Sequence, residues 1–382
     1  QEEDAKTQFA YDKKNPFPAV LKTNRLLNGE GSGKEVRHYE ISLEGSGLVY
    51  EVGDALGVYP SNCQDVVREI LQVMGWNAGE EVTIADTKMS LEDALLHRLD
   101  VTRPSKELLS AAAALGAFGG KLSELLVDTQ KDQLQKFLWG REVIDVLAEV
   151  AGKFTSQEGL KLLKKQQPRL YSISSSPNAH PGEVHLTVAA VRYESHGRKR
   201  KGVCSTYLAD RVGSETRVGV FVQRSHGFRL PDNGNVPVIM CGPGTGIAPF
   251  RAFLEERKVS GAKGKNWLFF GDQKQATDFL YQEELEQWLK EGHLTRLDLA
   301  FSRDQAEKVY VQDRMLQSAN ELWAWLEAGA HFYVCGDASR MAKDVEGALL
   351  SIAQTVGGLS ASEAEGYIQN LKTQKRYQRD VY

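Results

Sequence analysis

Residues 236–258 read VPVIMCGPGTGIAPFRAFLEERK. An apolar strand runs into a turn that contains Gly242, Gly244 and Gly246, and a helical pattern follows. Glycines let a backbone approach a phosphate closely, and the first turn of a helix offers free N–H groups to it. The stretch therefore predicts a dinucleotide-binding turn at the carboxyl edge of a strand, although its G-x-G-x-G spacing differs from the usual G-x-G-x-x-G. A glycine-rich turn without a ligand is the alternative, which the position between strand and helix disfavours.

Beyond this turn, strands and helices alternate. The apolar strands PVIMCG, NWLFFG, RLDLAFS and HFYVCG are interleaved with amphipathic helices near 247–258, 279–290, 310–327 and 339–355. This alternation predicts an α/β domain with a parallel sheet over residues 233–382. The stretch 231–237, rich in Pro, Asn and Gly, is the expected boundary before it.

The residues before this boundary show two other patterns. Residues 16–60 and 167–232 contain short strands, as in RHYEISL, where Tyr39, Ile41 and Leu43 alternate with polar residues. Residues 61–166 instead carry apolar residues at helical spacing. We therefore expect a multidomain protein in which one antiparallel β-barrel is split by an all-helical insert and followed by the α/β domain.

The composition excludes several classes of protein. Of 382 residues, 41% are hydrophobic and 26% charged, and the net charge of −4 disfavours a nucleic-acid binder. The four cysteines, which form no C-x-x-C pair, and the histidines predict no metal site, and so few thiols favour a reducing, cytoplasmic compartment. The longest apolar run, 111–118, is far short of the ~20 residues that cross a bilayer, so we expect no membrane span.

One further stretch invites a phosphate-binding interpretation that we reject. NGEGSGKE, residues 28–35, has Asn28 where a P-loop needs Gly and Glu35 where it needs Ser or Thr, so we expect a hairpin loop. The basic run HGRKRKG, residues 196–202, is also expected to be a solvated hairpin loop.

Two upstream segments are better candidates. In QPRLYSISSSP, residues 167–177, alternation sends Arg169 and Tyr171 to one face of a strand. Arg offers a forked donor to phosphate and Tyr a flat surface to a ring. Further on, Gly202 and Ser205 precede a helical pattern and form a second candidate phosphate turn. Two such turns suggest two dinucleotides.

RLYS, GVCS, CGPGTGIAPFR, SRDQAEKVYVQD, YVCGDA and RDVY occur in this order. Together they resemble the FAD/NADPH module of diflavin reductases, within the ferredoxin–NADP reductase superfamily, and most of all the flavoproteins of NADPH–sulfite reductases. The resemblance covers essentially the whole chain. It implies that hydride passes from NADPH to FAD and that electrons continue, through an FMN flavodoxin-like domain, to a sulfite reductase haemoprotein with sirohaem and an iron–sulfur cluster.

That partner would reduce sulfite to sulfide for sulfur assimilation and cysteine biosynthesis. The equivalent fragment of a haem-monooxygenase-type NADPH reductase is the first alternative, and a non-catalytic docking subunit is the second. No span of the chain reads as the FMN domain, and the sequence begins with Gln1 rather than Met. We therefore expect the FMN domain on a missing segment or on a separate protein.

The resemblance also implies roles for individual residues. Arg169 would bind the FAD pyrophosphate, Tyr171 would stack on the isoalloxazine, and Tyr193 would lie near the adenine. The residues implied for FAD are Arg169, Leu170, Tyr171, Ser172, Thr187, Val188, Ala189, Tyr193, Gly202, Val203, Cys204 and Ser205. Those implied for NADPH are Gly242, Gly244, Thr245, Gly246, Ser302, Arg303, Lys308, Val309, Tyr310, Val311, Gln312, Asp337 and Asp344.

One residue conflicts with NADPH. Asp272 follows the second strand of the α/β domain, where an acid usually binds the ribose of NAD. Arg303 and Lys308 would instead suit the 2′-phosphate of NADPH, and we give these two cations more weight.

Four residues are predicted to be catalytic: Ser172, Cys335, Asp380 and Tyr382. By the resemblance, the first three would surround the reacting atoms, and Asp380 could handle the proton at flavin N5. Tyr382 would cover the flavin face opposite Tyr171 and move aside for the nicotinamide. A Tyr packed in a surface groove is the alternative.

Overall fold

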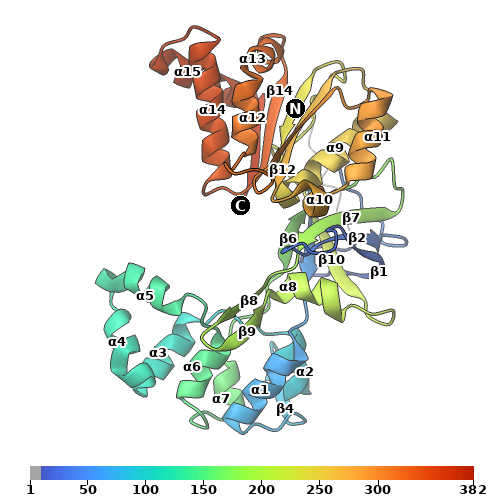
Figure 1. Ribbon diagram of the computed structural model, residues 1–382. Coiled ribbons are helices and arrows are strands. Elements are labelled where there is room, and N and C mark those ends of the chain that lie inside the picture. The colour runs from blue at the N-terminus through green and yellow to red at the C-terminus, as the bar shows by residue number, and fades with distance from the viewer. Residues whose placement is uncertain (1–9) are drawn as a thin grey trace, which may run out of the picture. The chain divides into compact units, whose positions relative to one another are not determined.

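Figure 1 shows a computed structural model of the chain, which describes residues 10–382. Its internal contacts divide the chain into two compact units. The first unit comprises the described residues up to Gly57, Leu170–Ala189 and Val220–Tyr382, and the second comprises Val58–Arg169 and Ala190–Gly219. The chain thus leaves the first unit and returns to it twice.

A six-stranded sheet, mostly within the first unit, has the strand order β6-β3-β10-β1-β2-β7. Its strands are β1 (Phe17–Leu26), β2 (Val36–Ser42), β3 (Ala55–Tyr59), β6 (Arg169–Ser172), β7 (Glu183–Ala189) and β10 (Val218–Gln223). β2 pairs with β1 and β7 in antiparallel fashion, and an antiparallel bridge from Ile173 to Leu186 joins the two edges. Tyr39, Ile41 and Leu43 are buried, as their alternation indicates. The predicted antiparallel sheet is confirmed.

The first unit also contains a five-stranded parallel sheet, β13-β12-β11-β14-β15. Its strands are β11 (Val238–Cys241), β12 (Asn266–Asp272), β13 (Arg296–Phe301), β14 (His331–Gly336) and β15 (Tyr377–Val381). The predicted parallel sheet is confirmed, but the sequence analysis missed β15, because YQRDV lacks the apolar run of a buried strand.

Helices cover both faces of the parallel sheet (Figure 1). α9 (Ala248–Val259), α10 (Gln275–Asp278) and α11 (Gln282–Glu291) lie on one side, and α12 (Val311–Gln317), α13 (Ala319–Glu327), α14 (Met341–Thr355) and α15 (Ala361–Thr373) on the other. Within residues 10–382, every helix is too short or too polar to cross a membrane.

The second unit is built mainly of short helices. They are α1 (Gln64–Met74), α2 (Leu91–His97), α3 (Lys106–Ala114), η1 (Ala117–Gly120), α4 (Lys121–Leu125), η2 (Asp128–Gln130), α5 (Lys131–Leu138), α6 (Val143–Glu149), α7 (Ser156–Leu160), α8 (Val203–Thr206) and η3 (Tyr207–Arg211). Residues 61–166 are not wholly helical, however, because β4 (Glu81–Ile84) and β5 (Thr87–Ser90) form a hairpin. Its turn places Ala85 and Asp86 at positive φ, a conformation that the apolar periodicity does not reveal.

Within the first unit, α9 joins the two sheets through a buried polar network. Arg251 donates to the Ser174 carbonyl at 2.8 Å and contacts His185 Nδ1 at 3.2 Å. Because Arg can only donate, His185 carries its proton on Nε2, which donates to Glu183 at 2.9 Å. A metal ion at that nitrogen would have to displace this proton, so we interpret the cluster as a hydrogen-bonded clamp between β7 and α9.

Candidate active site

The glycine turn joins β11 to α9 through the 3-10 helix η4 (Gly244–Ile247). A Cβ on Gly242 would lie 2.3 Å from the Gly246 carbonyl oxygen, and one on Gly246 would lie 2.2 Å from the Cys335 carbonyl oxygen. The turn follows β11, the strand at which the order of strands in the sheet reverses. The next strands along the chain, β12 and β13, lie on one side of β11, and the later β14 and β15 lie on the other. Dinucleotides bind at such switch points.

We expect Gly246→Ala to lower the free energy of unfolding by roughly 1–3 kcal/mol, because the new Cβ would overlap the backbone of β14. Gly347→Ala is the matched control, since Gly347 lies exposed in α14 with nothing within 4 Å of an added Cβ. Its replacement should be neutral or stabilising. Chemical denaturation of both variants tests the packing, and equal effects would contradict it.

Three of the predicted catalytic residues lie together in the first unit. Ser172 ends β6, Cys335 lies in β14, and Asp380 is opposite Cys335 in β15. Ser172 Oγ donates to Asp380 Oδ2 at 2.6 Å, and Cys335 Sγ lies 3.9 Å from the same oxygen. Burial raises the pKa of the Cys335 thiol well above its usual value, so the thiol stays protonated. The Ser172 hydroxyl and the neutral Cys335 thiol thus both contact the same carboxylate oxygen of Asp380.

Tyr382 lies beside this group. Its backbone N–H donates to the Gly336 carbonyl at 3.0 Å, and its carbonyl accepts from Ala338 at 2.9 Å. The phenol oxygen is 3.0 Å from Thr245 Oγ1, in the glycine turn, while 65% of the residue is exposed. The backbone is therefore anchored to the end of β14, but the ring is held by one hydrogen bond and can move without disturbing the sheet.

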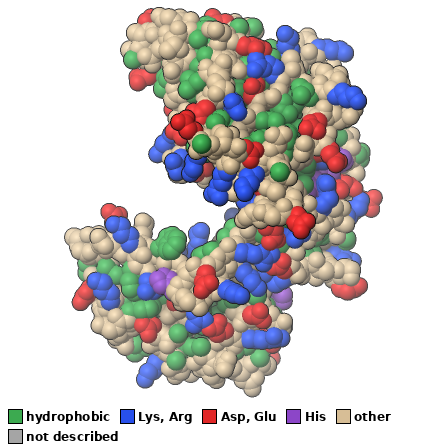
Figure 2. Space-filling view, in the orientation of Figure 1, with side chains coloured by type: hydrophobic (Ala, Val, Ile, Leu, Met, Phe, Trp, Pro, Cys, Tyr) green, Lys and Arg blue, Asp and Glu red, His purple; other side chains and the backbone are tan. Residues whose placement is uncertain are grey.

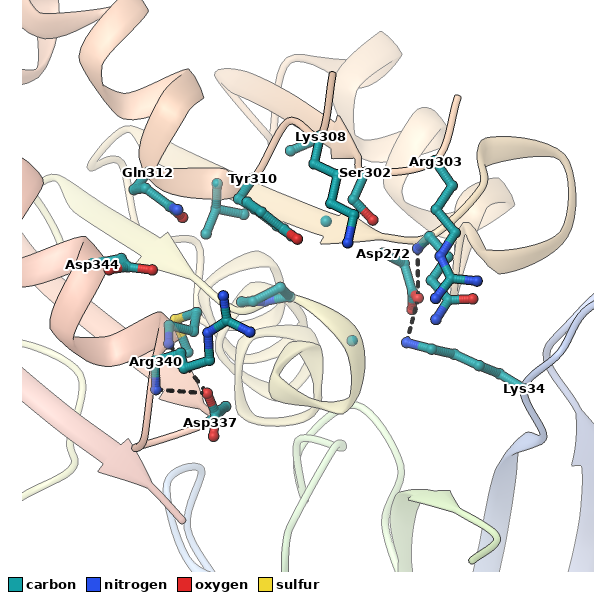
Figure 3. A pocket seen from close by; sticks show the side chains of 17 residues that line it. Lys34, Asp272, Ser302, Arg303, Lys308, Tyr310, Gln312, Asp337, Arg340 and Asp344 are labelled. Carbon is teal, nitrogen blue, oxygen red and sulfur yellow. Dashed lines mark hydrogen bonds and ion pairs between the residues drawn. The ribbon is translucent and has the colours of Figure 1, made fainter. Parts of the chain in front are cut away.

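A cavity of about 380 Å³ lies at the carboxyl ends of the parallel strands. Figure 3 shows Ser302, Arg303 and Lys308 reaching toward it from the segment after β13. Most residues predicted for NADPH line this one cavity: Gly244, Ser302, Arg303, Lys308, Tyr310, Val311, Gln312, Asp337 and Asp344. In Figure 2, Lys and Arg side chains gather on the first unit near the position labelled C in Figure 1. The cavity can therefore hold an anionic ligand.

Other predicted residues lie outside the cavity lining. Gly242 and Gly246 are used in packing the turn, Thr245 contacts Tyr382, and Val309 packs against the core between the parallel sheet and α12–α15. Asp337 lines the cavity and also caps α14, accepting from the N–H of Arg340 at 2.9 Å. Hydrogen bonds from Ser339 and the backbone lower the pKa of Asp337 to about 2.

Lys34 is a cavity residue that the sequence analysis missed. It comes from the loop 28–35 between β1 and β2, and its Nζ lies 2.6 Å from Asp272 Oδ1 (Figure 3). Because Lys34 compensates the negative charge of Asp272, this carboxylate no longer argues against a 2′-phosphate in the cavity. Asp272 is buried, and its Oδ2 has no protein partner. A buried acceptor without a partner fits a ligand that donates a hydroxyl.

The first unit holds half of the residues predicted for FAD. Leu170 and Tyr171 lie in β6, and Leu170 is 54% exposed. Thr187, Val188 and Ala189 end β7. Thr187 Oγ1 lies 2.6 Å from the Tyr281 hydroxyl, and Val188 is buried. Thr187 is itself buried.

The second unit holds the remaining ones. Arg169 Nη1 donates to the Gln167 carbonyl at 3.2 Å, and Tyr193 lies 44% exposed in β8 (Arg192–Ser195). Gly202 precedes α8, where a Cβ would lie 2.7 Å from Ser205 Oγ. The first hydrogen bond within the helix is donated by the N–H of Thr206 to the Gly202 carbonyl. The N–H groups of residues 203–205 come before this bond, at the position where a helix start can donate to a phosphate. Buried Cys204 packs behind the turn. Such a turn fits a pyrophosphate.

A closed antiparallel sheet with a phosphate turn, combined with a parallel sheet whose switch point carries a glycine turn, defines a flavin- and nicotinamide-binding oxidoreductase. Residues 10–207 match the family model described as FAD binding domain, and residues 240–347 match that described as oxidoreductase NAD-binding domain. The chain belongs to the FAD binding domain family, whose model covers more than half of it. It combines an FAD-binding domain with an oxidoreductase NAD-binding domain, so its cofactors are FAD and a nicotinamide dinucleotide.

Curated relatives are similar over nearly the whole chain. The sulfite reductase [NADPH] flavoprotein alpha-component of Bacillus subtilis is 49% identical over 380 residues, which cover 98% of this chain and 62% of the relative. Those of Vibrio vulnificus and Mannheimia succiniciproducens are each 47% identical over 372 residues, which cover 97% of this chain and 60% and 62% of the relatives. The chain thus spans about 60% of their length.

Proposed function

We propose that this chain takes hydride from NADPH onto FAD at the group formed by Ser172, Cys335 and Asp380. One observation carries the proposal: the hydrogen bond from Ser172 to Asp380 joins β6 to β15, one strand from each sheet, beside the dinucleotide turn. Two cofactors bound to the two sheets would meet there. Anaerobic addition of NADPH should bleach the flavin absorbance of the purified protein. A protein that stays colourless after FAD is added, or whose flavin NADPH does not reduce, would rule the proposal out.

Different residues would bind the two cofactors. The glycine turn and the cavity cations Arg303 and Lys308 would hold the phosphates of NADPH, and Ser302 and Tyr310 would complete the 2′-phosphate site. Tyr171 would stack on the flavin, and the turn 202–205 with Arg169 would bind the FAD pyrophosphate. When bound, NADPH supplies the hydride and FAD accepts it.

Asp380, Ser172 and Cys335 would stabilise the charge that develops during hydride transfer and handle the proton at flavin N5. Asp380 can stabilise the positive charge that develops on the nicotinamide, because its carboxylate lies at the meeting point of the strands. Ser172 donates a hydrogen bond to Asp380, and this pair could accept the N5 proton when reduced FAD gives up its electrons. Cys335 remains a neutral thiol and shields the carboxylate from water.

Tyr382→Ala is expected to raise the affinity for NAD⁺ and NADP⁺ about tenfold, because the nicotinamide would no longer compete with the ring for the flavin face. The variant should use NADH better and release NADP⁺ more slowly. Steady-state kinetics with both nucleotides and product inhibition by NADP⁺ measure these effects. Tyr382→Phe keeps the ring and should resemble the wild type, whereas unchanged nucleotide preference in Tyr382→Ala would remove the cap.

The domain boundaries are also part of the proposal. Residues 16–60 and 167–232 would form the FAD-binding barrel, 61–166 the helical connecting insert, and 233–382 the NADPH-binding domain. The closed antiparallel sheet, the helices α1–α7 and the parallel sheet support this division.

Electrons would leave FAD for an FMN flavodoxin-like domain and then for a sulfite reductase haemoprotein that converts sulfite to sulfide. The names of the relatives and their greater length support this route. A reconstitution tests it: the chain, an FMN domain and the haemoprotein should together form sulfide from sulfite and NADPH. Sulfide formation that is as fast without the chain would contradict the route.

A further inference from the structure

The hairpin of β8 and β9 (Arg198–Lys201) contains the basic run of the sequence analysis. Tyr193 lies opposite Arg200, and Ser195 opposite Arg198. Residues directly opposite each other share a face, so both arginines lie on the face of Tyr193. Arg200 is only 3% exposed, whereas Lys199 on the other face is exposed. The expectation of a solvated loop is therefore wrong for Arg200, which is buried and pairs with the half-buried carboxylate of Asp145.

Asp145, in the first turn of α6, holds both arginines. Its Oδ2 lies 2.8 Å from Arg200 Nη2, and its Oδ1 lies 3.2 Å from Arg198 Nε. Arg200 Nε also donates to Ser195 Oγ at 3.0 Å, and that hydroxyl donates to the Gly140 carbonyl at 2.6 Å. One half-buried carboxylate thus fastens the hairpin to the helices of the second unit.

The other end of the hairpin is fastened to the phosphate turn. Val191 N–H donates to Ser205 Oγ at 3.0 Å, and Gly202 N–H donates to the Val191 carbonyl at 2.8 Å. Tyr193 therefore stands between two anchors, two residues after Val191, and the residue is 44% exposed. An exposed ring on a backbone that is fixed on both sides, near a turn that fits a pyrophosphate, is a surface on which a base can stack.

We propose that Arg200, through Asp145, holds Tyr193 where the adenine of FAD stacks. Arg200 is then a positioning residue for the AMP half of FAD. This inference rests on the proposed binding of FAD, and it goes beyond it by naming what fixes the adenine surface. Loss of Arg200 would leave Asp145 with a weaker partner, free the hairpin and misplace Tyr193.

Binding of FAD and of FMN to the flavin-free chain tests the inference, because FMN has the same isoalloxazine but no AMP half. Arg200→Met should weaken FAD about tenfold, the worth of one base–aromatic stack, and change FMN less than about twofold. Lys199→Met, on the opposite face of the same strand, should change neither. Tyr193→Ala should show the pattern of Arg200→Met, and the double variant should bind FAD no more weakly than Tyr193→Ala.

Three results would overturn the inference. Equal weakening of FAD and FMN by Arg200→Met would indicate a general loss of structure, and additive effects of Arg200→Met and Tyr193→Ala would show that Arg200 does not act through Tyr193. Unchanged FAD affinity in Tyr193→Ala would show that the adenine lies elsewhere, while NADPH could still reduce the flavin. If Arg200→Met does not fold, Ser195→Ala removes the milder contacts to Arg200 and Gly140 and gives the same FAD and FMN comparison.

Discussion

Asp380→Asn should slow the reduction of bound FAD by NADPH about a hundredfold, within the range of ~10²–10³ for the loss of one group that stabilises charge in the transition state. The substitution keeps the shape of the side chain but removes the charge that accepts from Ser172 and faces the hydride path. Stopped-flow loss of flavin absorbance measures the rate. The affinity for NADP⁺ should change little, because Asp380 does not line the phosphate cavity.

Arg379→Gln is the matched control, since Arg379 neighbours Asp380 in β15 and is exposed. It should leave the rate near that of the wild type. Ser172→Ala should slow reduction less than Asp380→Asn does, and it should add little in the Asp380→Asn background because the two residues share one hydrogen bond. Flavin reduction at the wild-type rate in Asp380→Asn would remove Asp380 from the mechanism.

Removing two of the cavity cations, by Arg303→Ala together with Lys308→Ala, should weaken the binding of 2′-AMP roughly a hundredfold or more. Each charge-assisted contact contributes about 1.5–3 kcal/mol. The affinity for 5′-AMP should change far less, because it lacks the 2′-phosphate that these side chains would face. Isothermal titration calorimetry with the two nucleotides measures the difference without any need for turnover.

Lys343→Ala is the control for charge, because Lys343 is exposed in α14 and does not line the cavity. It should leave the affinities for 2′-AMP and 5′-AMP almost unchanged. Equal losses for both nucleotides in the double variant would contradict a site for the 2′-phosphate and leave the choice of NADPH to other residues, with Lys34 the next to test.

Local sequence patterns were enough to predict those strands and turns whose conformation is determined by residues close to one another in the sequence. The apolar strands β11, β12, β13 and β14 and the glycine turn follow from periodicity and turn chemistry. β15 was missed, because its burial comes from α15 and β14 rather than from its own composition. The grouping of Ser172, Cys335 and Asp380 came from the resemblance to a family, since no local pattern links residues so far apart.

Long-range contacts also explain the residues that sequence reasoning missed. Lys34 and Asp272 lie 238 positions apart, and their pairing depends on how loop 28–35 meets the end of β12. Arg200 was expected to be solvated because its run is basic, but its partner Asp145 lies in α6, far from it in the sequence, and no local pattern links the two residues. The expected roles of Asp272 and Arg200 were thus revised because each forms an ion pair with a residue that is distant in the sequence.

β15 is the outermost strand of its sheet and is hydrogen-bonded to a single neighbouring strand, β14. It nevertheless carries Asp380, and Tyr382 follows it. A peripheral strand can detach in a local opening that costs far less than global unfolding. Such an opening would separate Asp380 from Ser172 and Cys335, the group proposed for hydride transfer, while the hydrophobic interior stayed intact. An inactive molecule of this protein could then still look folded by its circular dichroism.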